Sequence, residues 1–400
     1  MASASKRNRV MNRSRILRVI WHHPGTSRVD IAERLGLDKS TVSSVVAELL
    51  QSGIIREIAH GEASPQGGRR PVKLELQADY GFVLGVELQP DYVRAVLYDL
   101  SGGLVREWEH ERPRNGQEFE FYLLALLEEL LADIEDLRDR LVGIGVAMGG
   151  LVNSIQNVIY RSIPMNLSEQ YDFQTGIAEK LGIPVIAEND ANACAWGELT
   201  AHRGTMVHDF LYLLVQLRES PSGRHLYGGI GVGIGIAING TLYPGSRFTA
   251  GEFRSAFWDS QGSGQFTLTD GEADLVTTDS AIRQRLFREL ARNVALIINV
   301  LNLDHLFIGG DVRKYRDELT PIIEEELRRN WPYETGVECE ICYSSYGHQA
   351  VVAGAASMML DRLFSDQIFP LGDIRNRHER ESVLTQITER GFNLDPVGGS

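Results

Sequence analysis

The sequence predicts an α/β protein in which an N-terminal winged helix-turn-helix precedes a duplicated fold of two lobes with a central cleft. Charge supports this division. The 400 residues carry a net −14, but residues 1–73 hold 13 Lys and Arg against six Asp and Glu, a net +7 that leaves −21 for the rest. Caps and turn glycines delimit three short helices before residue 53. After residue 77, two blocks of hairpin-linked strands are each followed by helices.

Three helices are predicted between residues 14 and 53. A first amphipathic helix opens at Ser14 and ends before a Pro-Gly pair. Ser27 and Asp30 have the spacing of a capping box at the start of a second helix, over residues 29–35. A third helix is expected over residues 39–51. Two helices joined by a short turn with a glycine are typical of a DNA-reading unit, whose second helix enters the major groove.

The third helix carries the residues expected to read DNA. Asp38 stands at its N-cap position, and small polar or basic side chains follow on its exposed face. Such groups reach base edges and phosphates. The predicted contacts are Lys39, Ser40, Thr41, Ser43 and Ser44.

A basic wing completes the predicted domain. Strands over residues 54–59 and 72–77 flank a loop with the run Gly-Gly-Arg-Arg-Pro. Arg69 and Arg70 are expected to follow phosphates or to enter a narrow minor groove. The alternative is a helical protein-interaction module with a solvated basic loop. The agreement of caps, turn, polar face and wing favours DNA binding.

The domain boundaries follow from the change in composition after residue 76. We expect a DNA-binding domain over residues 1–76 and a first lobe over 77–190, which a C-terminal helix near 350–365 completes. The second lobe spans 191–349, and residues 366–400 form a tail. A cleft between two such lobes is the default place for a small-molecule site.

Five segments of the lobes resemble the ROK proteins, a family of sugar kinases and sugar-responsive repressors with an actin-like ATPase fold. The segments are Glu-Asn-Asp-Ala-Asn at 188–192, the glycine-rich strand at 229–235, Ala-Gly-Glu-Phe at 250–253, Phe-Ile-Gly-Gly-Asp at 307–311 and Val-Ala-Gly-Ala-Ala at 352–356. Together with the predicted winged helix, the resemblance points to the repressor branch, which includes xylose and N-acetylglucosamine regulators.

The resemblance also implies what a kinase of this family would need, and three of its parts are missing. The first phosphate loop, Asp-x-Gly-Gly-Thr in the kinases, is Glu-Leu-Gln-Pro-Asp at 87–91, and Pro90 has no N–H to donate. Ile230 replaces a hydroxyl residue in the second loop, and residues 256–275 contain no Cys for the family's zinc. We therefore expect no kinase activity, no metal and no cofactor.

The site residues are inferred from the same resemblance. Asp190 matches the kinase base but is expected to bind sugar, because a carboxylate accepts hydrogen bonds from two hydroxyls. Asn189 and Glu252 are the next candidates, followed by Asn166 and by Ser255 in place of a family His. The alternative is that Asn189 and Asp190 only cap the helix that follows them.

The remaining expectations concern cysteines and the compartment. Three cysteines cannot build a disulfide framework, and Cys339 and Cys342 lie in an apparent strand, where positions i and i+3 face opposite sides. Two uncharged runs, over 141–160 and 225–246, are broken by Gly and polar residues, so we expect no membrane insertion. We expect a cytoplasmic protein.

The predicted function is a sugar-responsive transcriptional regulator, most simply a repressor of carbohydrate genes. Its expected partners are operator DNA and a sugar effector, and the chain is expected to form a homodimer or homotetramer. Two alternatives stay open: a bifunctional sugar kinase and regulator, or a repressor controlled by a protein partner instead of a sugar.

Overall fold

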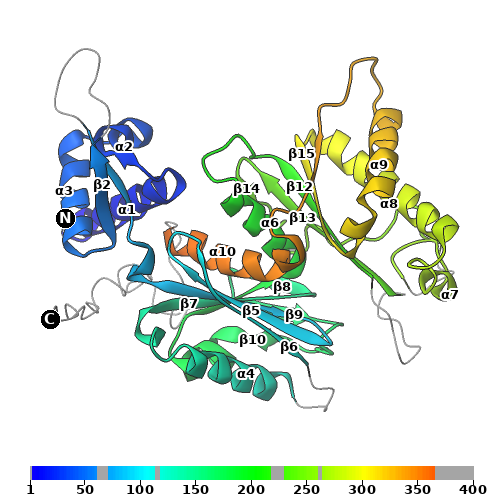
Figure 1. Cartoon of the computed structure of the whole chain (residues 1–400), viewed down its shortest axis with the longest axis horizontal. Coiled ribbons are helices and arrows are strands. Elements are labelled where there is room, and N and C mark those ends of the chain that lie inside the picture. The colour runs from blue at the N-terminus through cyan, green and yellow to red at the C-terminus, as the bar shows by residue number, and fades with distance from the viewer. Residues whose placement is uncertain (1, 61–70, 113–117, 218–228, 260–263, 365–400) are drawn as a thin grey trace.

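The computed structural model describes residues 2–60, 71–112, 118–217, 229–259 and 264–364 (Figure 1). An N-terminal helical domain lies at one end, and two mixed five-stranded sheets with their helices form the rest. The predicted α/β architecture, a winged helix followed by a duplicated two-lobed fold, is thereby confirmed.

The N-terminal domain contains three helices and a small sheet. They are α1 (Ala2–His22), α2 (Arg28–Leu35) and α3 (Lys39–Gln51), with strands β1 (Thr26–Ser27), β2 (Ile55–His60) and β3 (Val72–Leu76) in the order β1-β3-β2. The capping box of Ser27 and Asp30 is present. Two details differ from expectation: α1 begins at Ala2, well before Ser14, and Asp38 makes no side-chain cap bond.

The first lobe is built on a sheet with the order β11-β7-β4-β5-β6. Its strands are β4 (Phe82–Leu88), β5 (Tyr92–Asp99), β6 (Leu104–Glu111), β7 (Leu141–Met148) and β11 (Val185–Asn189). The central strand β4 is buried on both faces, as its sequence, apolar except for Glu87, indicates. Helix α4 (Phe119–Asp133) covers the outer face, and a short 3-10 turn (Arg138–Arg140) precedes β7.

The second lobe repeats this arrangement with the order β14-β13-β12-β15-β16. Its strands are β12 (Phe210–Leu217), β13 (Ile230–Ile238), β14 (Thr241–Leu242), β15 (His305–Gly310) and β16 (Glu340–Tyr343). In both sheets the successive strand pairs on one side of the central strand are antiparallel, and those on the other side are parallel. Helices α7 (Asp270–Ala273), α8 (Ser280–Leu301) and α9 (Arg316–Asn330) belong to this lobe.

Helices α6 (Asp190–Ala201) and α10 (Ala350–Phe364) cross between the sheets. Each follows the last strand of one sheet and packs on the other: α6 contacts β12 and β13, and α10 contacts β4 and β7 (Figure 1). The crossing is close, because a Cβ on Gly354 would lie 1.8 Å from the carbonyl oxygen of Ala193. Glycine is required there. The two lobes are therefore joined by their own helices.

A third sheet, in the order β10-β9-β8, extends from the first lobe. It contains β8 (Leu151–Asn153), β9 (Val158–Arg161) and β10 (Tyr171–Asp172), and α5 (Glu179–Leu181) follows it. This sheet places residues 149–151 and 161–164 beside the start of α6.

One apolar cluster joins the DNA-reading domain to the lobes. It unites Leu17 and Trp21 of α1 with Met359 and Phe364 of α10, and the Trp21 and Phe364 rings lie 5.3 Å apart. Because α1 and α10 share this buried core, α10 holds the N-terminal domain against the first lobe.

The two cysteines of β16 and its approach pack into different clusters. Cys339 contacts the cluster under α8 and α9, and Cys342 contacts the cluster around α6. Both are free, partly buried thiols. The two thiols are apart, as expected, but the strand is shorter than the sequence suggested, because β16 begins at Glu340 and Cys339 precedes it.

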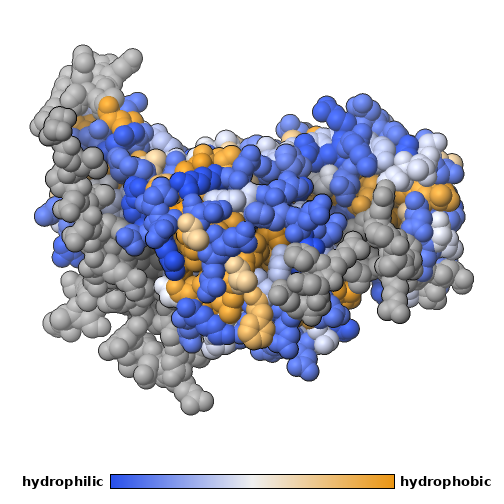
Figure 2. Space-filling view, turned by 60° about the horizontal axis from the view of Figure 1, so that its bottom comes forward, coloured by the Kyte–Doolittle hydropathy of each residue, from blue (hydrophilic) through white to orange (hydrophobic). Residues whose placement is uncertain are grey.

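The outer surface is polar over much of its extent. Figure 2 shows mostly hydrophilic residues on the face that includes the first sheet, with hydrophobic residues in separate spots between them. Phe121 of α4 is one exposed hydrophobic residue, with 66% of its surface in solvent. Among the described residues, no helix combines the length and apolar character that crossing a bilayer requires.

Candidate functional site

A cavity of about 190 Å³ lies where the two lobes meet, at the start of α6. An ordered water needs roughly 10–15 Å³ by this measure, so the space suits a small organic ligand. Its wall comes from both lobes. The lining residues are Gly149, Gly150, Leu151, Arg161, Ile163, Pro164, Asn189 and Asp190 from the first lobe side, and Leu214, Gln216, Gly231, Val232, Gly233, Ala250, Gly251, Glu252 and Gln265 from the second.

Asp190 is the first residue of α6 and lies 6% exposed in the cavity wall. The backbone N–H of Ala191 donates to its Oδ1 over 3.0 Å, and the positive end of the helix dipole favours its negative charge. Gly149 and Gly233 lie on either side: a Cβ on Gly149 would come within 3.4 Å of Oδ2. The glycines therefore keep the space beside the carboxylate open.

Asn189 has two structural roles beside the cavity. Its Oδ1 accepts from the N–H groups of Ala191 and Asn192, which caps α6. Its Nδ2 donates to the carbonyl oxygen of Gly150 over 3.0 Å. The capping alternative is therefore realised for Asn189, and the same bonds fix the backbone on which Asp190 stands.

Glu252 approaches the same cavity from the second lobe. It follows Gly251, whose φ is +86° and where a Cβ would lie 1.7 Å from the carbonyl oxygen of Ile234. The segment is held on β13 by the N–H of Ile234, which donates to Gly251. Glu252 is an exposed residue, and its carboxyl group is only partly removed from water in the cavity wall. This partial desolvation, followed by the charge of Asp190, raises its pKa to about 7.

Arg161 and Gln216 are polar wall residues that the sequence did not reveal. Arg161 ends β9, and among the described residues no hydrogen bond or ion pair engages its guanidinium. Nothing in residues 158–161 predicts that this short strand faces the cleft. Gln216 stands near the carboxyl end of the predicted strand β12, a position that does carry a signal, since ligands bind at strand ends.

Two other candidates lie away from the cavity wall. Asn166 is exposed on a tight turn between Ser162 and Leu167 and adopts a left-handed φ of +56°. Ser255 is buried, and its Oγ accepts from Asn293 and from the N–H of Phe257. Neither residue is among those that line the cavity.

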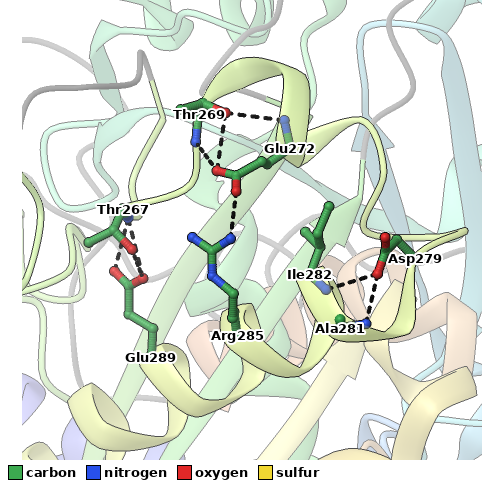
Figure 3. A network of polar contacts seen from close by, with 8 residues as sticks. All are labelled: Thr267, Thr269, Glu272, Asp279, Ala281, Ile282, Arg285 and Glu289. Atoms are coloured by element: carbon green, nitrogen blue, oxygen red, sulfur yellow. Dashed lines mark hydrogen bonds and ion pairs between the residues drawn. The ribbon is translucent and has the colours of Figure 1, made fainter.

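Hydrogen bonds order the region where the family's zinc would be expected. Gln265 binds both the N–H and the carbonyl of Val232 and donates to the carbonyl of Phe253. Further along, Glu289 of α8 accepts from the N–H and hydroxyl of Thr267 (Figure 3). Ser255 and its amide neighbours are weak donors for Zn²⁺, which takes Cys, His or carboxylate ligands, so this residue set does not fit the metal.

A capping network continues this order toward α8 (Figure 3). Thr269 and Glu272 form a capping box on α7, and Glu272 pairs with Arg285 over 2.5 Å. Asp279 caps α8 through the N–H groups of Ala281 and Ile282. Within the residues that the structure describes, no three His, Cys, Asp or Glu side chains gather as a metal site would require.

The segment that replaces the first phosphate loop is filled by its own side chains. Glu87 is 1% exposed and accepts from Tyr92 Oη and Gln89 Nε2. Arg94 Nη1 lies 4.0 Å from its carboxylate and donates to the carbonyl of His348. Burial raises the pKa of Glu87 to about 7 against the opposing effect of Arg94. Ile230, in the second loop, is buried in the apolar cluster beneath α8.

Helix α3, which is expected to read DNA, presents the predicted polar face. Lys39, Ser40, Ser43 and Ser44 are exposed and Thr41 is half-buried, while Val42, Val45, Val46 and Leu49 are buried. Glu48, one turn further, pairs with Arg9 of α1 over 2.5 Å. Arg69 and Arg70 of the predicted wing lie outside the described residues.

Comparison with known proteins agrees with both parts of the chain. Residues 83–254 match the ROK family, and residues 12–56 match the winged helix-turn-helix DNA-binding family. The chain is 28% identical to the xylose repressor of Bacillus subtilis (strain 168) over 389 residues, which cover 90% of this chain and 97% of that protein. It is 30% identical to the xylose repressor of Bacillus spizizenii over 243 residues, which span 60% of this chain and 59% of that protein.

Two solved structures share the fold. One is a ROK family transcriptional regulator described as a homologue of the Escherichia coli MLC protein, with a TM-score of 0.75 and 20% identity over 96% of this chain and 100% of that chain. The other is a ROK family glucokinase from Streptomyces griseus in complex with glucose and AMPPNP, with a TM-score of 0.53 and 18% identity over 70% of this chain and 99% of that chain.

The class of protein follows from the fold and the cavity: an actin-like protein of two lobes with a cleft between them, joined to an N-terminal winged helix-turn-helix. Within this class, the chain carries a ROK family domain behind a winged helix-turn-helix. The resemblance inferred from the sequence is confirmed.

Proposed function

We propose that this protein is a sugar-responsive transcriptional repressor that binds operator DNA through its winged helix and a sugar between its lobes. The observation that carries the proposal is the meeting of Asp190 and Glu252, from opposite lobes, in one polar cavity. Carboxylates bind vicinal hydroxyls through short charge-assisted hydrogen bonds, which suits a sugar. The xylose repressors among its relatives support the same ligand class.

The proposed sugar contacts are Asp190, Glu252 and Asn189, together with Arg161. Asn189 retains one N–H that its cap and its Gly150 bond do not use. Arg161 supplies cationic donors at the edge of the cavity. A sugar held from both lobes favours the closed arrangement, and it acts only through its different affinity for the open and closed states.

Operator binding is assigned to α3, with Lys39, Ser40, Thr41, Ser43 and Ser44 as contacts and with Arg69 and Arg70 on the wing. A dimer would read two half-sites about 34–36 Å apart, so small rotations of the two domains change affinity. A full switch from 1:99 to 99:1 would require about 5.5 kcal/mol of differential sugar binding. Such a protein acts in the compartment that holds the DNA, the cytoplasm.

A thermal-shift panel of neutral sugars and sugar phosphates tests the ligand class, because a ligand that binds the native state raises its stability by mass action. We expect at least one sugar to raise the melting temperature and to change affinity for a duplex selected from a random pool by the full-length chain. Selection of a duplex without any sugar response would contradict the proposed effector and leave control by a protein partner.

A sugar kinase is the second candidate, because Asp190 stands where the family's general base is expected and the S. griseus glucokinase shares the fold. The contacts of Glu87 and the apolar burial of Ile230 argue against phosphate binding in both loops. A coupled ADP assay over the same sugar panel separates the two functions. Sustained turnover of ATP would establish the kinase.

A further inference from the structure

Four charged side chains form a continuous series from the cavity wall to the DNA-reading domain. Glu188 lies near the end of β11 in the first sheet, directly before Asn189 and Asp190. Asp361 and Arg362 are adjacent in the last turn of α10, and Arg18 lies in α1. Their charges alternate in sign along the series. Neither the proposed sugar contacts nor the proposed DNA contacts include them.

Glu188 fixes the start of α6. It is 2% exposed, and its Oε1 accepts from the N–H of Asn189 over 2.9 Å and from Nδ2 of Asn192 over 3.2 Å. These bonds hold the first turn of the helix that carries Asp190. Any displacement of that turn therefore acts on Glu188.

Arg362 connects Glu188 to α10. Its Nη2 donates to Ser154 Oγ over 3.2 Å, and Ser154 is also hydrogen-bonded to Glu188. The Arg362 guanidinium and the Glu188 carboxylate interact electrostatically as well: burial raises the pKa of Glu188, and Arg362 opposes this rise. A buried carboxylate requires such a partner, because an unpaired charge in the interior costs several kcal/mol.

Asp361 connects α10 to the DNA-reading domain. It is 8% exposed, and Arg18 Nη2 donates to its Oδ1 over 3.1 Å. The neighbouring Phe364 packs on Trp21, so the last turn of α10 contacts α1 through both an ion pair and two rings. Asp361 and Arg362 are adjacent, and the turn cannot follow Glu188 without moving the acceptor of Arg18.

We propose that the series Glu188–Arg362–Asp361–Arg18 transmits the state of the sugar cleft to the DNA-binding domain. The proposal rests on the sugar and operator binding proposed above and adds the residues that couple them. A sugar that draws Asp190 toward Glu252 shifts the first turn of α6, and Glu188 moves with it. Arg362 follows its buried partner, the last turn of α10 rotates, and α1 follows through Arg18 and Trp21.

The test measures coupling separately from binding in the full-length chain. Two variants break the series on either side of α10. Arg362→Gln weakens the contact of α10 with Ser154 and Glu188, and Asp361→Ala removes the ion pair with Arg18 of α1. D-xylose, D-glucose and N-acetylglucosamine serve as probes, with sugar affinity measured by calorimetry and affinity for the selected duplex measured with and without each sugar. Arg106→Gln is the matched control, because it breaks an Arg–Asp pair on the outer surface of the first lobe.

We expect both variants to keep sugar affinity and sugar-free DNA affinity within about threefold of the wild type, and to lose most of the sugar-induced change in DNA affinity. The control keeps the full change. A folded variant of either kind that binds both partners and keeps the wild-type change overturns the proposal. If Arg362→Gln fails to fold, Asp361→Ala decides alone, since it removes the partner of the half-exposed Arg18 and keeps the bond of Arg362 to Ser154.

The failures of the two proposals differ in the wild-type chain. A wild type that responds to a sugar while both variants respond equally removes the coupling series and leaves the repressor intact. A wild type that binds DNA but responds to none of the three sugars overturns the sugar effector and the coupling series with it.

Discussion

The carboxylates of Asp190 and Glu252 come from opposite lobes and face one cavity, and partial removal from water, together with the charge of Asp190, raises the pKa of Glu252 to about 7. The ionised carboxylate accepts charge-assisted hydrogen bonds from hydroxyls at both oxygens, whereas protonation removes the charge and turns one oxygen into a donor. The proposed sugar site is therefore expected to respond to pH close to neutrality.

Sugar affinity should fall as the pH drops below 7, by about tenfold between pH 8 and pH 6, because Glu252 then carries a proton. Calorimetry of the responsive sugar between pH 5.5 and 8 measures this. Glu252→Gln should bind weakly at every pH and lose the dependence near pH 7, while Glu324→Gln, on the exposed side of α9, should retain it. A wild-type affinity that is constant over this range would contradict the role of Glu252.

Asp190→Asn should lower sugar affinity by about 100-fold or more, since it removes a charged acceptor for hydroxyls, and each such bond contributes about 1.5–3 kcal/mol. Affinity for DNA without sugar should not change, because Asp190 lies in the cleft. Calorimetry and a DNA-binding titration measure the two effects. Asp136→Asn on the surface is the control, and a variant at Asp190 that stays fully responsive would remove it from the site.

The buried Glu87 should make stability depend on pH. Its pKa is about 7 in the folded chain and near 4.5 in the unfolded chain, so the folded state favours the protonated carboxyl. Its contribution to folding stability is complete below pH 4.5 and is lost as the pH rises through 7. The unfolding free energy of Glu87→Gln minus that of the wild type should therefore be about 2–3 kcal/mol larger at pH 8 than at pH 5. Urea unfolding at both values measures this.

Glu109→Gln provides a control of opposite sign, because the hydrogen bond from Arg94 lowers the pKa of this exposed carboxyl. Its removal should reduce stability at pH 8 more than at acid pH. If the unfolding free energies of Glu87→Gln and Glu109→Gln changed with pH in the same way, the pH dependence could not be assigned to Glu87.

The order around residues 264–279 should depend on hydrogen bonds and not on a metal. Incubation with EDTA should leave the melting temperature unchanged. Glu289→Gln should reduce stability by about 1–3 kcal/mol, since it leaves a donor of Thr267 without an acceptor. Glu324→Gln again serves as the control, and a large drop with EDTA would show that a metal stabilises this region.

Operator affinity should decrease steeply with salt, because basic residues that bind phosphates release counterions from the duplex. Replacing both Arg69 and Arg70 with Ala should weaken binding to all DNA sequences. It should also reduce the slope of log binding constant against log salt concentration by up to about two. Ser43→Ala on α3 should instead relax the choice of bases. Titrations with the selected duplex and a scrambled one measure both, and an unchanged affinity at moderate salt would remove the wing from the interface.

The sequence predicted features that depend on nearby residues. The capping box of Ser27 and Asp30 and the start of α6 after β11 follow from local patterns, and the structure contains both. Arg161 was missed because its place in the wall depends on how the short hairpin of β8 and β9 packs beside α6, which the local sequence does not report. Asn166 was inferred from likeness to the family, and in the structure it lies on an exposed turn that does not line the cavity.

Buried charges in α10 were missed for a different reason. Asp361 and Arg362 have the composition of an exposed helix end, and only the packing of α1 and Ser154 against them shows that they are enclosed. Their partners are hundreds of residues away in sequence, at Arg18 and Ser154. No local pattern reports such contacts.

The position of α10 also sets an order of events during synthesis. A ribosome releases the winged helix first, and the helix against which it packs is made last among the described elements. The nascent chain therefore carries a DNA-reading domain without the surface that orients it. The orientation of the DNA-reading domain on the first lobe is therefore fixed only after translation has passed Phe364.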